Sequence, residues 1–141
     1  MNRNERGLLL THGAAVLLLG LLLGLAAVGE ELAGTQPQRW RAGHGALLLA
    51  GLWLLVIGAV FPILVLPPRQ KTALCWSLLV TVYAFTIAIV LQASTGMRML
   101  APGPSLVGWA GYVANIITVG AGIFAGVLTL LGAFGTLKSE H

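Results

Sequence analysis

Residues 44–66 read HGALLLAGLWLLVIGAVFPILVL, a run that contains no charged residue. At a rise of 1.5 Å per residue, a helix of about 20 apolar residues crosses the roughly 30 Å hydrocarbon core of a bilayer. Three further runs of comparable length lie at about 8–28, 72–92 and 105–136. The sequence therefore predicts an all-α fold, an integral membrane bundle of four transmembrane helices that forms a single domain over residues 1–141.

The composition of the 141 residues is typical of a membrane protein. Hydrophobic residues make up 57% of the chain and charged residues only 9%, which lies outside the balance of soluble globular domains. The net charge of +4 comes from basic residues beside the predicted spans, and no basic stripe with interleaved aromatics accompanies it. Nucleic-acid binding is therefore not expected. The function must lie within the bundle or at its rims, in contact with membrane lipid.

The basic residues predict an orientation in the membrane. One side receives the larger share of them, and the two groups are Arg3, Arg6, Arg69, Lys71 and Lys138 against Arg39, Arg41 and Arg98. Because cytoplasmic segments carry the excess of Lys and Arg, we expect cytoplasmic termini in a bacterial inner membrane. The first span resembles a signal peptide in its basic start, but we expect it to be retained as a helix.

Glycine, proline and threonine patterns within the runs predict local structure. The pairs Gly20/Gly24 and Gly122/Gly126 have the spacing that lets helix backbones approach closely, so we expect packing contacts there. The dipeptide Pro-Pro at 67–68 is expected to end the second helix. Hydroxyl side chains within the spans are expected to bond across helices or back to the carbonyl four residues earlier; they include Thr81, Thr86 and Thr118.

Two histidines lie in or beside the apolar runs, and each begins the tripeptide His-Gly-Ala. An ionisable side chain at membrane depth is costly and marks a candidate functional site. His12 is expected about one turn inside the first span, whereas His44 opens the second span from the opposite surface. The two imidazoles are then roughly 20 Å apart along the membrane normal, so they cannot bind one metal ion together. A haem held by this chain would therefore have one histidine ligand and one open position.

His44 is the better candidate for a metal ligand. Gly45 follows it and Gly51 shares its helix face, so both leave room for a flat macrocycle. Arg41, about one turn earlier, lies where the carboxylates of a porphyrin would emerge and could pair with them. An imidazole that only caps the helix or reaches to the membrane surface explains the same position equally well.

Two segments resemble a known family. Residues 8–20, LLLTHGAAVLLLG, are similar to the opening of the hydroxylaminobenzene mutases. Residues 40–45, WRAGHG, followed by Gly51, are similar to the corresponding segment of that family and of its relatives, the styrene oxide isomerases. The match of length, span count and motif order extends over nearly the whole chain. This resemblance implies a homotrimer of four-helix subunits in which His44 ligates haem b, with ferric iron acting as a Lewis acid without net redox change.

The chain departs from those families at two positions. Ala50 stands where they have an asparagine before the glycine, and Phe85 stands in a third-span segment where they have another. The two amides that could orient a substrate are therefore missing, and each lost polar contact is worth on the order of 1–3 kcal/mol. Tyr83 and Asn115 are the candidates for a relocated catalytic contact, since Asn115 is the one asparagine inside a predicted span.

Two functions from different classes follow. The first is a haem b-dependent membrane isomerase or lyase that polarises a C–O or N–O bond of a small lipophilic epoxide or hydroxylamine. The second is a haem-binding or structural membrane subunit without catalytic activity. A transporter fits less well, because the spans lack the charged residues that usually line a substrate path.

Overall fold

The computed structural model describes residues 3–35, 38–97 and 99–139, which are helical almost throughout. The helices are α1 (Arg3–Leu32), α2 (Gln38–Val60), α3 (Pro68–Thr95) and α4 (Leu106–Ser139), with a short 3-10 helix, η1 (Phe61–Ile63), after α2. No strand occurs in the described ranges. Each of the four α-helices is long and apolar enough to cross a membrane. The predicted all-helical fold with four membrane-spanning helices is confirmed.

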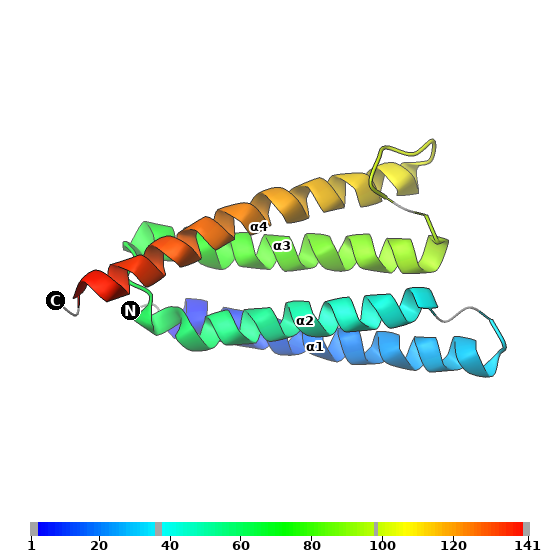
Figure 1. Cartoon of the computed structure of the whole chain (residues 1–141), viewed down its shortest axis with the longest axis horizontal. Coiled ribbons are helices and arrows are strands. Elements are labelled where there is room, and N and C mark those ends of the chain that lie inside the picture. The colour runs from blue at the N-terminus through cyan, green and yellow to red at the C-terminus, as the bar shows by residue number, and fades with distance from the viewer. Residues whose placement is uncertain (1–2, 36–37, 98, 140–141) are drawn as a thin grey trace.

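The helices form two antiparallel hairpins, α1 with α2 and α3 with α4 (Figure 1). Helix α1 begins and α4 ends at the same end of the bundle, which we call the terminal end. The α1–α2 and α3–α4 connections both lie at the opposite end, which we call the loop end. The two hairpins contact each other mainly through α3, which packs against both α1 and α2. Helix α4 packs mainly against α3 and leaves much of its surface exposed.

Two of the predicted boundaries of the second helix are wrong. Helix α2 begins at Gln38, so His44 lies six residues inside it rather than opening it. The helix ends at Val60 and passes into η1, because Pro62 has no N–H donor and disfavours a helical residue before it. The two prolines at 67–68 start α3, with Pro67 at its N-cap and Pro68 at its first position.

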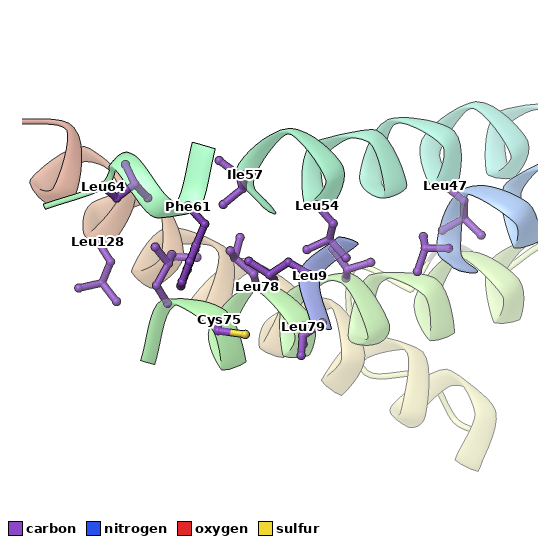
Figure 2. Close-up of a cluster of buried hydrophobic side chains, with 14 of the residues drawn as sticks. Leu9, Leu47, Leu54, Ile57, Phe61, Leu64, Cys75, Leu78, Leu79 and Leu128 are labelled. Atoms are coloured by element: carbon purple, nitrogen blue, oxygen red, sulfur yellow. The ribbon is translucent and has the colours of Figure 1, made fainter. Parts of the chain in front are cut away.

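All four helices contribute to one apolar core (Figure 2). Leu9 of α1, Leu54 of α2, Leu78 of α3 and Leu128 of α4 are all buried in it. In the terminal half, α4 also crosses the segment that joins α2 to α3: the backbone N–H of Val65 donates to the Gly132 carbonyl at 3.1 Å. These contacts hold the two hairpins together at the terminal end.

The packing predicted for the first glycine pair is confirmed. A Cβ placed on Gly20 would lie 3.0 Å from the Leu48 backbone nitrogen, so α1 and α2 touch backbone to backbone there. The second pair differs: Gly122 lies beside Thr81 of α3, but nothing lies within 4 Å of a Cβ placed on Gly126. The predicted threonine bonds to carbonyls four residues earlier are also confirmed, for Thr81, Thr86 and Thr118.

Candidate functional site

The His44 imidazole lies at the interface of α1 and α2 in the loop half of the bundle. Its side chain is half-buried, and Nδ1 lies 2.7 Å from the carbonyl oxygen of Gly20. A carbonyl oxygen can only accept a hydrogen bond, so Nδ1 must carry the proton and donate it. In the neutral ring the other nitrogen, Nε2, then has a free lone pair, and it bonds to no residue that the structure describes. This is the tautomer that can coordinate a metal through Nε2.

Gly24 makes the space that the His44 ring occupies. A Cβ placed on Gly24 would lie 2.8 Å from Nδ1 and 3.0 Å from Cε1 of His44. The Gly20/Gly24 pair therefore has two functions, since Gly20 accepts the imidazole hydrogen bond and Gly24 admits the ring. Sequence reasoning interpreted the pair only as helix packing and missed both. The sequence did contain a signal for this contact. Gly20 and Gly24 lie near the end of the first span and His44 near the start of the second, so all three are expected at the same end of neighbouring helices.

The two glycines predicted to border a macrocycle have different surroundings. Nothing lies within 4 Å of a Cβ placed on Gly45, so the space beside it is open. A Cβ on Gly51 would lie 2.6 Å from the Leu17 backbone nitrogen and 2.9 Å from the Gly13 carbonyl oxygen. Gly51 thus serves the close contact between α1 and α2, and the open space lies at Gly45.

Two arginines precede His44 on α2 and have different partners. Arg41 forms an ion pair with Glu31 near the end of α1, with both side chains about half exposed. Arg39 lines a groove of about 490 Å³ between α2 and α3, together with Gly43, Gln92 and Gly96. The guanidinium of Arg39 lies against Gly96, whose φ of 70° terminates α3 in the left-handed conformation. Only one terminal nitrogen of Arg41 meets Glu31, so the other guanidinium N–H groups can still pair with a ligand carboxylate.

His12, the second membrane histidine, pairs with Tyr83 of α3. Nδ1 of His12 lies 2.6 Å from the Tyr83 hydroxyl oxygen, and the rings meet edge to face with centroids 5.6 Å apart. Tyr83 was predicted as a catalytic contact, and the structure brings it to His12 rather than into a hydrogen bond with His44. Nothing in the sequence indicated this pair, because the pairing depends on how α1 and α3 align.

Asn115, the other predicted catalytic residue, holds the α3–α4 connection. Its Nδ2 donates to the Met99 carbonyl at 2.8 Å, and the buried Met99 side chain packs against Gly111 of α4. Asn115 lies on α4, a helix that packs mainly against α3. It makes no hydrogen bond to His44. Ala50 and Phe85, at the positions of the missing amides, both pack against the apolar core.

The donor set around His44 suits a group that takes one protein ligand. Within the described ranges, no three side chains of His, Cys, Asp or Glu come together as a zinc or non-haem iron site would require. A metal-ligating histidine characteristically donates its other ring N–H to a carbonyl or carboxylate, which fixes the tautomer and the ring orientation. His44 meets this condition through Gly20, and Gly45, which follows it in the chain, has nothing within 4 Å of a Cβ placed on it. These residues fit a haem with a single axial imidazole.

Comparison with known proteins places the chain in a family. A family model described as styrene oxide isomerase matches residues 5–138. The chain belongs to the styrene oxide isomerase family. No curated protein and no solved structure matches it in the corresponding searches. Membership of this family suggests an isomerase-type function, and the four apolar helices indicate a membrane protein.

Proposed function

We propose that this member of the styrene oxide isomerase family is a haem b-dependent membrane isomerase or lyase acting on a small lipophilic substrate. The observation that carries the proposal is the hydrogen bond from His44 Nδ1 to the Gly20 carbonyl, at 2.7 Å. It holds the imidazole in the tautomer whose Nε2 can bind iron, and Gly24 leaves the room for that ring.

Each of these residues would have its own role in binding the haem. His44 would hold the iron, the Gly20 carbonyl would orient the His44 ring, and Gly45, which carries no side chain, would leave room for the haem. Arg41, whose guanidinium has donors that Glu31 does not use, would pair with a propionate. When bound, ferric haem supplies a Lewis acid that polarises an epoxide or hydroxylamine oxygen.

The substrate would be recognised by shape more than by polar contacts. Ala50 and Phe85 pack in the apolar core where family relatives have amides, so neither offers a hydrogen bond. Tyr83 and Asn115 are already bonded, to His12 and to the Met99 carbonyl. Asn115 keeps its Oδ1 and a second N–H for a substrate, and the Tyr83 hydroxyl, which can both donate and accept, keeps one of these two roles. An apolar substrate with one Lewis-basic atom suits such surroundings.

The same apolar substitutions favour a second candidate, a haem-binding membrane subunit without catalytic activity. In this account His44 would still bind the haem, and the loss of both amides would have removed the chemistry. The resemblance to the family supports a homotrimer, and the distribution of basic residues supports cytoplasmic termini in a bacterial inner membrane, as part of either proposal.

Turnover measurements test the catalytic proposal. Purified ferric protein, without added reductant, is offered styrene oxide and, separately, phenylhydroxylamine, and the rearranged products are quantified by gas or liquid chromatography. We expect slow turnover that His44→Ala abolishes and His12→Ala retains. Turnover that His44→Ala leaves unchanged would exclude iron as the catalyst. Haem binding through His44 without turnover of either compound would favour the non-catalytic subunit.

A further inference from the structure

A second site lies at the terminal end of the bundle, far from His44. A cavity of about 870 Å³ opens there between the first turns of α1, the η1 segment and the start of α3. We call it the rim cavity; its lining residues are Glu5, Arg6, Leu10, Phe61, Leu66 and Lys71, with Gly7, Pro62, Pro68 and Thr72 completing it.

The rim of the cavity carries an excess of positive charge. Arg6 is exposed and Lys71 is half-buried, and neither forms an ion pair with a residue in the described part of the chain. Glu5 also lines the cavity, but its carboxylate accepts a hydrogen bond from the Thr72 hydroxyl at 2.5 Å. Helices α1 and α3 both begin here, so the positive ends of their dipoles add to the field of the two cations. The rim therefore favours an anionic group.

The floor of the cavity is apolar. Phe61 is 4% exposed, and Leu10 and Leu66 line the cavity beside it. Lys71 connects the charged rim with the apolar floor through a cation–π contact, since its Nζ lies 5.9 Å from the centroid of the Phe61 ring. A small hydrated anion would leave this floor in contact with water, whereas a ligand with an alkyl chain would cover it. The cavity therefore suits an amphiphile that has an anionic head group and an alkyl chain.

We propose that the rim cavity binds an anionic phospholipid of the surrounding membrane. Its phosphate would lie between Arg6 and Lys71, and one acyl chain would pack on Leu10, Phe61 and Leu66. The position agrees with this occupant, because the cavity lies at the ends of helices long enough to cross a membrane, where lipid headgroups are expected. Basic pockets between transmembrane helices are known to hold anionic headgroups. The proposal does not depend on the function of His44.

Native mass spectrometry of the full-length protein in non-ionic detergent tests the proposal. The protein is mixed with phosphatidylglycerol or with phosphatidylcholine of the same acyl chains, and the bound lipid is counted. We expect selective retention of phosphatidylglycerol, and a loss of about fivefold in its binding for each of Arg6→Gln and Lys71→Gln, since a basic residue near an anionic surface contributes about 1 kcal/mol. Arg69→Gln is the matched control, because Arg69 is exposed on α3, the helix that carries Lys71, and does not line the cavity.

Several outcomes would overturn the proposal. Equal binding of the two lipids would show that the head charge is not recognised, and an equal loss with Arg69→Gln would show that only diffuse surface charge acts. Displacement of the lipid by inorganic phosphate, or equal binding of a six-carbon-chain phosphatidylglycerol, would show that the apolar floor is not used. Circular dichroism of each variant verifies the helical fold, which the exposed position of Arg6 leads us to expect to be retained.

Discussion

Nδ1 of His12 lies 2.6 Å from the hydroxyl oxygen of Tyr83, and this hydrogen bond joins the α1–α2 hairpin to the α3–α4 hairpin. The pair is separate from His44. Next to His12, a Cβ on Gly13 would lie 3.0 Å from the backbone nitrogen of Leu55, so His12 is level with Leu55 on α2. Leu55 follows His44 by eleven residues, or about 16 Å along the helix. The two histidines therefore occupy different depths and have different partners.

Removal of the Tyr83 hydroxyl should weaken the contact between the hairpins and leave the His44 site intact. We expect Tyr83→Phe to lower the free energy of unfolding by about 0.6 kcal/mol, the average for side-chain hydrogen bonds between membrane helices, and by no more than about 1.7 kcal/mol, the largest such value. Thermal unfolding in detergent, followed by circular dichroism, measures the change. Tyr112→Phe is the control, because no hydrogen bond of the Tyr112 hydroxyl is found among the described residues. Equal stability of Tyr83→Phe and the wild type would show that the bond contributes nothing.

Substitution of Gly24 should disturb the ring of His44 directly. A Cβ at this position would lie 2.8 Å from Nδ1, so Gly24→Ala must move the imidazole or separate α1 from α2. We expect haem occupancy, measured as the ratio of Soret to 280 nm absorbance, to fall at least several-fold. Gly29→Ala makes the same change on the same helix, where nothing lies within 4 Å, and should keep full occupancy. Equal haem content in the two variants would contradict the role given to Gly24.

Gly51 should matter for stability through the contact of α1 with α2. A Cβ there would lie 2.6 Å from the Leu17 backbone nitrogen, and backbone atoms cannot rotate away as a side chain can. We expect Gly51→Ala to destabilise the protein by about 1–3 kcal/mol, as overpacking of a close contact does. Gly126→Ala, where the space is open, should leave the unfolding temperature almost unchanged. The idea fails if both alanines unfold at the wild-type temperature.

The number and order of the helices could be predicted from the sequence because the apolar runs alone determine them. The exact ends could not, because helices continue through polar residues: α2 begins at Gln38, in the polar segment before His44. The end of α2 depends on Pro62. The apolar run continues on both sides of Pro62, so hydropathy alone does not mark a helix end there. The prolines at 67–68 were read as a helix stop, whereas proline at the first position of a helix loses no hydrogen bond.

The site was predictable only in part, because its geometry depends on contacts between helices. The sequence singled out His44 by its residue type and depth. Its bond to the Gly20 carbonyl depends on how far α1 and α2 are shifted along each other. The sequence of either helix alone does not determine that shift. The bond between His12 and Tyr83 depends in the same way on α1 and α3. The assignment of His44 as haem ligand stays a prediction.

The absorption spectrum of the detergent-purified protein, saturated with haem, tests the central claim most directly. Wild type and His12→Ala should both show the Soret band of a haem with one histidine ligand, and His44→Ala should lose it while circular dichroism still shows a helical protein. A Soret band that persists in His44→Ala and disappears in His12→Ala would contradict the assignment.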